Sequence, residues 1–236
     1  MLETHELSSG YKELHILFDV DFKAEKKKIT AVVGPNGSGK STLLKSIFGF
    51  TTIYNGRIIL DREEITHLPP HEKTKLGIAY LPQTDNVFTE LTVRENLVIA
   101  GYILDEAEYH DRLELALNVF PELRDKMDRK AGMLSGGERQ FLGIASALIR
   151  RARVLMLDEP TAMLSPKFAS QVFERVLSLR DELGLTIVLV EQNVIKALEM
   201  SDNALMLIGG KVAFSGTARE LLEHEKFERF IVGYTL

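Results

Sequence analysis

The feature that most constrains the fold is a glycine-rich run that fits the phosphate-binding pattern G-x-x-x-x-G-K-[ST]. An apolar, β-branched stretch at Ile29–Val33 precedes it and is predicted to be a buried strand, and a helix is predicted over Lys40–Phe48. The run is therefore a strand-to-helix turn, in which backbone N–H groups and a positive helix end converge on one concavity. Such a concavity binds polyphosphate. The run consists of Gly34, Pro35, Asn36, Gly37, Ser38, Gly39, Lys40, Ser41 and Thr42.

Two side chains of this run have specific chemistry. Lys40 would place a positive charge over the β- and γ-phosphates, and Ser41 would offer a hydroxyl oxygen to Mg²⁺. The alternative is a glycine-rich turn that only joins a strand to a helix. The predicted strand before the run and the predicted helix after it favour the phosphate site.

A second glycine-rich run, Leu-Ser-Gly-Gly-Glu, occupies residues 134–138. Ser135 followed three residues later by Glu138 is the pattern of a capping box at the start of a helix. Further along, the apolar stretch 154–157 is followed directly by Asp158 and Glu159. This is the layout of a buried parallel strand that presents two carboxylates at its carboxyl end.

Composition excludes several classes of protein. The chain has 236 residues, which is enough for one α/β core with an inserted subdomain and too few for a second full-size domain. Its net charge of −5 argues against a surface that binds nucleic acid. It contains no cysteine, which excludes disulfides and thiolate metal sites and suits a reducing compartment. No stretch approaches the roughly 18 apolar residues of a membrane span, so we expect any membrane role to come from a partner.

The N-terminal third is predicted to add a β layer to the phosphate-loop core. Residues 17–23 alternate, with Phe18, Val20 and Phe22 on one face, as in a half-buried antiparallel strand. Residues 56–60 are predicted to form another strand.

The middle of the chain has a different character. Helical spacing over residues 91–103 and 106–120 indicates an inserted helical subdomain at about 84–150. Residues 1–83 and 151–236 are then expected to form one nucleotide-binding core within a single domain.

Alternation of strand and helix returns after the insert. A helix is expected over residues 166–183, with Ser165 as its N-cap and Gly184 at its end. The other predicted elements are a strand at Thr186–Val190, a hairpin over 204–214 that turns at Gly209-Gly210, and a last helix capped by Thr217. We therefore predict an α/β fold with a mainly parallel sheet, an N-terminal antiparallel β layer and the helical insert.

The phosphate loop, the 134–138 signature and the Asp158-Glu159 strand end, in this order, resemble the ATP-binding subunits of ABC transporters. The resemblance covers essentially the whole chain and implies a P-loop NTPase core that binds ATP and Mg²⁺. ATP hydrolysis needs a metal held in place, and Asp158 is expected to bind Mg²⁺ either directly or through one of its ligands, together with Ser41. The resemblance implies that Glu159 is the catalytic glutamate that directs the attacking water.

The resemblance assigns roles to two further residues. Gln83, after Ile78–Leu81 and a proline, matches the family's glutamine that reaches Mg²⁺ and the water and joins the core to the helical insert. Tyr11 matches the aromatic residue that stacks on adenine; an N-terminal tyrosine is otherwise more often a surface or core residue.

The signature residues are expected to act across a dimer. In the family, the residues that match Ser135, Gly136 and Gly137, followed here by Glu138, meet the γ-phosphate of ATP bound to the opposite subunit. The resemblance therefore implies two nucleotides held between two chains, with ATP binding closing the dimer and hydrolysis loosening it.

Two segments depart from the usual family pattern. Gln192 stands where most members have histidine, and it can donate a hydrogen bond to a γ-phosphate oxygen but cannot carry a positive charge. Residues 162–165 read Ala-Met-Leu-Ser where most members have Ser-Ala-Leu-Asp, so the family's cross-dimer aspartate is replaced by Ser165. These two departures leave open whether the chain hydrolyses ATP at its own site, although Lys40, Asp158 and Glu159 are present.

One subfamily fits best. Val-Glu-Gln-Asn at 190–193, together with residues 120–124 ahead of 131–138, resembles the second ATPase subunit of branched-chain amino acid importers. The resemblance implies a permease, a second ATPase subunit and an extracytoplasmic solute-binding protein as partners, and a peripheral place on the cytoplasmic face of the membrane. The chain lacks the Thr-Glu-Val-Gly-Glu-Arg-Gly element of exporters, which favours import. Pro-Gln-Thr at 82–84 departs from the subfamily's usual Pro-Glu-Gly, which leaves the solute open.

Two alternatives belong to other functional classes. A soluble ABC ATPase that acts on DNA ends or ribosomes would carry two cassettes, coiled coils or basic arms, and this acidic single cassette has none. A regulatory protein that binds ATP without turnover is favoured by Gln192 and Ser165 and disfavoured by Glu159. A phosphate-release assay separates that reading from an ATPase.

Overall fold

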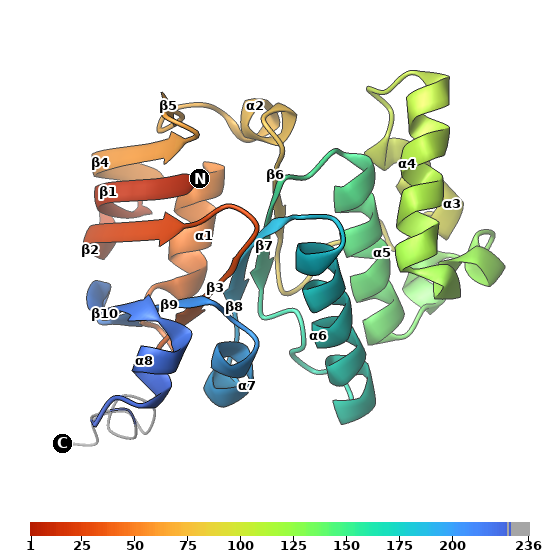
Figure 1. Cartoon of the computed structure of the whole chain (residues 1–236). Helices are drawn as coiled ribbons and strands as arrows, with labels where there is room; N and C mark the ends of the chain where they lie inside the picture. The colour runs from red at the N-terminus through yellow and green to blue at the C-terminus, as the bar shows by residue number, and fades with distance from the viewer. Residues whose placement is uncertain (226, 228–236) are drawn as a thin grey trace.

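Two β-sheets and the helices around them make up the computed structural model, which describes residues 1–225 and 227 (Figure 1). The larger sheet has the strand order β10-β9-β3-β8-β7-β6 and the smaller one the order β2-β1-β4-β5. The predicted α/β fold with a mainly parallel sheet and an antiparallel β layer is confirmed. Among the described residues, no helix combines the length and apolar content that crossing a membrane requires.

The six-stranded sheet is parallel except at one edge, where β9 and β10 form the predicted hairpin. Strands β3, β7 and β8 lie in its centre and every one of their residues is buried, as expected for parallel strands covered on both faces. The strands of this sheet are β3 (Ile29–Val33), β6 (Ile78–Leu81), β7 (Val154–Asp158), β8 (Thr186–Val190), β9 (Asn203–Ile208) and β10 (Lys211–Thr217).

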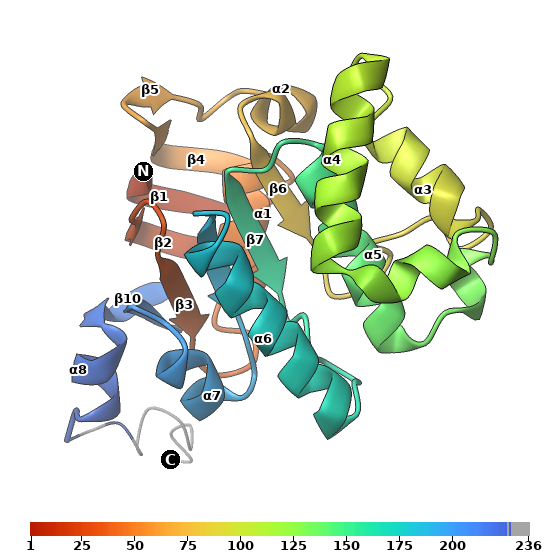
Figure 2. The same cartoon turned by 45° about the vertical axis from the view of Figure 1, so that its right-hand side comes forward.

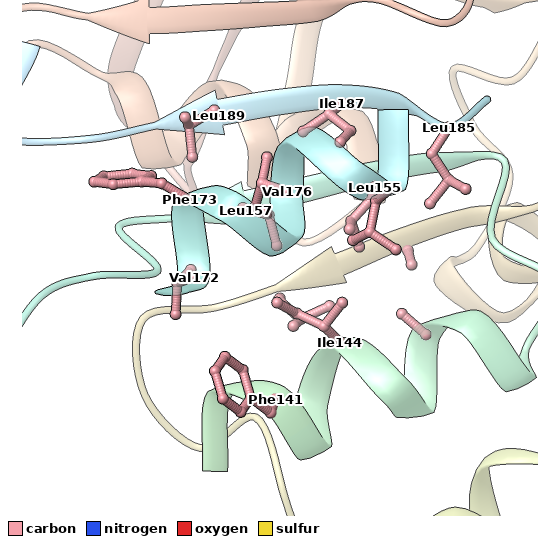
Figure 3. Packing of buried hydrophobic residues seen from close by; sticks show 14 of the residues in the cluster. Phe141, Ile144, Leu155, Leu157, Val172, Phe173, Val176, Leu185, Ile187 and Leu189 are labelled. Atoms are coloured by element: carbon pink, nitrogen blue, oxygen red, sulfur yellow. The ribbon is translucent and has the colours of Figure 1, made fainter. Parts of the chain in front are cut away.

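Each face of this sheet has its own apolar core. On one face, side chains such as Val154 and Met156 pack with α1 (Lys40–Phe48) and with the antiparallel sheet. On the other face, Leu155 and Leu157 pack with α5 (Gly136–Ile149) and α6 (Pro166–Asp181). Helices α1 and α5 therefore lie on opposite sides of the sheet. Figure 3 shows the second core, in which side chains of α5, α6, β7 and β8 meet.

The antiparallel sheet corrects one sequence expectation. Phe18 was predicted on the buried face of its strand, but it is 37% exposed, and the neighbouring Leu17 is fully buried. The β1–β2 register shifts there, and Asp19 adopts a left-handed φ of 51°, so the simple alternation is broken while Val20 stays buried. The strands are β1 (Leu2–Tyr11), β2 (Leu14–Ala24), β4 (Thr52–Leu60) and β5 (Glu63–Glu64).

The helices of the middle segment gather at the end of the molecule opposite the antiparallel sheet (Figure 2). The helix expected over 91–103 is shorter, because it begins after the capping box of Thr92 and ends at Gly101. The helices there are α3 (Val93–Ala100), α4 (Glu106–Val119), the 3₁₀-helices η1 (Pro121–Lys126) and η2 (Ala131–Met133), and α5.

The remaining helices follow their predicted caps. Ser165 accepts a hydrogen bond from the N–H of Phe168 at the start of α6, which ends two residues before the expected Leu183. Thr217 and Glu220 form the predicted capping box of α8 (Ala218–Leu222). The short helices α2 (Pro70–Lys75) and α7 (Val194–Glu199) were not predicted from the sequence.

Candidate nucleotide site

The glycine-rich run forms the predicted turn between β3 and α1. Gly34 has a φ of +143°, and a Cβ there would lie 2.1 Å from the carbonyl oxygen of Leu207. Gly39 is the N-cap of α1 with a φ of +100°. No side chain caps this helix start, so its first N–H groups are free to meet an anion.

Lys40 lies inside this turn and is only 5% exposed. Its Nζ donates hydrogen bonds of 2.9 Å to the carbonyl oxygens of Gly34 and Pro35. Burial lowers the pKa of Lys40, and the negative charges of Glu159 and Asp158 act in the opposite direction. The two carbonyl oxygens thus hold the ammonium group at the loop, close to where a polyphosphate would bind.

Asp158 ends β7 as a buried carboxylate with two donors. The Ser41 hydroxyl donates to Oδ1 at 2.7 Å, and the Tyr80 hydroxyl donates to Oδ2 at 2.9 Å. Tyr80 comes from β6, which pairs in parallel with β7. Burial raises the pKa of Tyr80, so its phenol remains a proton donor at neutral pH. Tyr80 was not predicted from the sequence, where its signal is a hydroxyl group within an apolar strand.

The oxygen atoms of Ser41 and Asp158 fit a magnesium ion. Mg²⁺ prefers hard oxygen ligands and usually takes few from the protein, the rest coming from water and phosphates. Within residues 1–225 and 227, no group of three histidine, cysteine, aspartate or glutamate side chains could hold a metal by itself. A magnesium ion at Ser41 and Asp158 would therefore be shared with the nucleotide.

Glu159 accepts hydrogen bonds from two side-chain amides. Its Oε2 accepts from Nε2 of Gln83 at 3.0 Å and from Nε2 of Gln192 at 2.7 Å. Its φ of 50° is uncommon for a residue other than glycine and costs on the order of 1 kcal/mol. Its N–H donates to the carbonyl oxygen of Val190, which ties the turn after β7 to the end of β8. The structure thus brings the predicted residues Gln83 and Gln192, from two different loops, to the carboxylate of Glu159.

Glu191 is a buried carboxylate that the sequence analysis did not single out. It is 2% exposed and accepts hydrogen bonds from Thr161 and from the N–H of Gln192. Burial raises its pKa, its hydrogen bonds act against this, and the charge of Glu159 adds to it. Its signal in the sequence is an acidic residue directly after an apolar strand, the same signal that identified Asp158.

Tyr11 lies at the end of β1, opposite Leu14 in the β1–β2 pair, and is 40% exposed. An exposed ring at a strand end can accept a stacked base. Its role at adenine remains a prediction.

The signature residues lie apart from the phosphate loop. Ser135 and Glu138 form the predicted capping box of α5, on the far side of the six-stranded sheet from α1. A groove of about 390 Å³ runs beside them and brings together the loop that begins at Gln83, Gly136 at the start of α5 and the loop that follows Glu159. Gly136 thus shares a groove with Gln83, whereas Lys40 begins α1, whose apolar residues pack on the other face of the sheet.

Comparison with known proteins agrees with this geometry. The model of a protein family described as ABC transporter matches residues 17–162. The chain is 67% identical over 233 residues to the probable branched-chain amino acid transport ATP-binding protein LivF of Archaeoglobus fulgidus, covering 99% of each chain. It is 36% identical to the high-affinity branched-chain amino acid transport ATP-binding protein BraG of Pseudomonas aeruginosa, covering 99% of this chain and all of that one. The crystal structure of the ADP conformation of an ATP-binding cassette of an ABC transporter superimposes with a TM-score of 0.87 at 29% identity, covering 99% of both chains.

Proposed function

Because the chain belongs to the ABC transporter family, as one of its ATPases, we propose that it powers the uptake of branched-chain amino acids through a separate permease. The observation that carries this proposal is the 67% identity, end to end, to a relative named for that transport. The side chains needed for ATP hydrolysis support it, since Ser41 of the glycine-rich turn binds Asp158, and Lys40 interacts electrostatically with Asp158 and Glu159.

The proposed chemistry divides among these residues. The N–H groups of residues 34–42 and the Lys40 ammonium bind the phosphates, and Ser41 and Asp158 hold Mg²⁺. When bound there, Mg²⁺ would supply positive charge that offsets the charge of the phosphates. Glu159 orients the attacking water and accepts its proton, while the amides of Gln83 and Gln192 hold its carboxylate in position.

A second copy or a sister ATPase completes the proposed site. Ser135, Gly136 and Gly137 are separated from their own phosphate loop by the sheet, so they would meet the nucleotide of a facing subunit. The helical insert at about 84–150 would move with the permease, and this contact would hold the chain at the cytoplasmic face of the membrane. An extracytoplasmic binding protein would deliver the solute to that permease.

Leucine uptake by cells that lack this gene tests the proposal. Cells complemented with the wild-type gene should recover uptake of labelled leucine, and cells complemented with Lys40→Ala should not, because the variant lacks the cation over the phosphates. Lys75→Ala removes an exposed lysine outside the phosphate loop and is the matched control for expression.

Each outcome has a distinct meaning. Unchanged leucine uptake in the deletion strain would refute the amino acid assignment. Absence of phosphate release by the purified chain, alone and with its sister subunit, would favour a regulatory protein that binds ATP without turnover.

A further inference from the structure

We propose that Glu191 is a positioning residue that joins the loop at residues 160–165 to Gln192, so that the alignment of Glu159 depends on this loop. The inference deepens the proposed ATPase function and rests on it. Glu191 itself reaches neither the phosphate loop nor Glu159 by a hydrogen bond; it acts through its neighbours.

The contacts of Glu191 bridge two loops. Its Oε1 accepts from both the N–H of Thr161 at 3.1 Å and the Thr161 hydroxyl at 2.7 Å. Its Oε2 accepts from the N–H of Gln192 at 3.2 Å. The Glu191 carboxylate therefore binds Thr161 in the loop at residues 160–165 and the backbone of Gln192 in the loop after β8.

The sheet explains why these loops meet. Strands β7 and β8 pair in parallel with Asp158 opposite Val190, so both loops leave the same edge. A buried carboxylate without a cationic partner is costly unless its oxygen atoms accept hydrogen bonds, and here three donors supply them. A glutamine in its place would present an N–H₂ group to one of these donors.

The bridged loop extends to an exposed tip. Leu164 N–H donates to the carbonyl oxygen of Thr161, which folds the loop back on its base, and Met163 at the tip is 85% exposed. Met163 and Leu164 also line the groove beside the signature residues. A facing subunit that displaces this tip would move Thr161, then Glu191, and through it the Gln192 amide that contacts Glu159. Occupancy of the partner face is thereby linked to the alignment of Glu159.

Steady-state kinetics and hydrogen exchange on the full chain test the inference. Glu191→Gln keeps the shape and loses one acceptor, and Thr161→Val keeps the N–H and loses the hydroxyl. Each should lower kcat for ATP about tenfold, with KM for ATP within twofold of wild type, because the phosphate loop is untouched. The double variant should be no slower than the worse single variant, since both changes break one link.

Hydrogen exchange of the nucleotide-free protein provides the readout that does not need activity. In Glu191→Gln, exchange should rise in peptides covering 160–165 and at Gln192, and stay unchanged over 34–42. Thr66→Val is the matched control, because it removes a buried hydroxyl that makes two hydrogen bonds in the other sheet. It should alter neither kcat nor exchange in these loops.

The failures are distinguishable. If the wild type releases no phosphate, alone and with its sister subunit, the proposed function fails, and the exchange data still decide whether Glu191 joins the loops. Unchanged exchange at 160–165, or multiplicative losses of kcat in the double variant, would overturn the role of Glu191 while leaving the ATPase assignment intact.

Discussion

At the scale of single residues, Gln192 is the substitution with the clearest chemical consequence. Its amide contacts Glu159 at 2.7 Å, which shows that the side chain reaches the predicted catalytic carboxylate. An amide donates a neutral hydrogen bond, whereas a histidine can also carry charge. The contact therefore holds Glu159 without adding a positive charge near the γ-phosphate.

We predict that Gln192→His raises ATP turnover of the isolated chain about tenfold, which corresponds to about 1.4 kcal/mol of barrier. A histidine at this position could polarise the γ-phosphate and hold the water in register with Glu159. Phosphate release under saturating Mg-ATP measures the change, with Gln192→Ala as the control that removes the donor. Rapid turnover in the wild type, and an equal or lower rate in Gln192→His, would contradict the prediction.

Lys73 is a second residue whose environment sets a measurable property. Its side chain is fully buried, and its Nζ donates to the carbonyl oxygen of Ile47 near the end of α1 at 2.8 Å. Burial lowers the pKa of Lys73 to about 8, whereas the unfolded chain should keep the ordinary value near 10.5. Between these two pH values the unfolded chain binds more protons than the folded chain.

The free energy of unfolding should therefore rise with pH between about 8 and 10.5, by up to about 3 kcal/mol from this one group. Lys73→Met should lose this rise, because it removes the titrating group. Urea unfolding at several pH values measures it, with Lys75→Met on the same helix as an exposed control. Parallel profiles for wild type and Lys73→Met would show that Lys73 does not titrate in this range.

At the scale of secondary-structure elements, the start of α5 depends on a close approach to α6. A Cβ on Gly137 would lie 2.3 Å from Cδ1 of Phe168 and 3.1 Å from its Cβ. Because the Phe168 Cβ is fixed to the backbone of α6, a side chain at Gly137 would push the helices apart. This glycine thus has a packing role besides its predicted place at the partner's nucleotide.

We predict that Gly137→Ala lowers the free energy of unfolding by about 1–3 kcal/mol in the absence of nucleotide, as expected for overpacking. Gly136→Ala is the matched control, because its nearest neighbour is the tip of Leu164 at 3.0 Å, which can rotate away. Urea unfolding compares the two variants. Adding Phe168→Ala to Gly137→Ala should restore much of the lost stability. Equal stabilities of Gly137→Ala and Gly136→Ala would argue against the packing role.

At the scale of the whole molecule, the sheet separates the two halves of the proposed nucleotide site. The phosphate loop leads into α1 on one face, and the signature leads into α5 on the other. In the proposed arrangement, one chain would present half of each site, and two chains facing each other would complete both.

We predict that Glu159→Gln forms a stable dimer with Mg-ATP. The change removes the proposed base and one negative charge, and the remaining amide oxygen can still accept from Gln83 and Gln192. Size-exclusion chromatography should show a shift to twice the monomer mass with Mg-ATP and none with ADP. A combined Lys40→Ala and Glu159→Gln variant should stay monomeric. A monomer of Glu159→Gln at saturating Mg-ATP would mean that the facing-subunit arrangement, or the role of Glu159, is wrong.

The sequence by itself determined the parts of this protein that depend on local patterns. The phosphate turn, the strand before Asp158 and the capping box of Ser135 were all predicted, because each is specified by residues close together in the chain. The hairpin at Gly209-Gly210 belongs to the same class. These elements include most of the candidate nucleotide site.

Only the tertiary structure decided the features that depend on distant neighbours. Phe18 is exposed because the register of β1 against β2 shifts beside it, which strand alternation cannot reveal. Tyr80 reaches Asp158 and Glu191 reaches Thr161 because parallel pairing places β6, β7 and β8 side by side. Hydrogen bonds between such strands join residues that are far apart in the chain, so their partners follow from the order of the strands in the sheet.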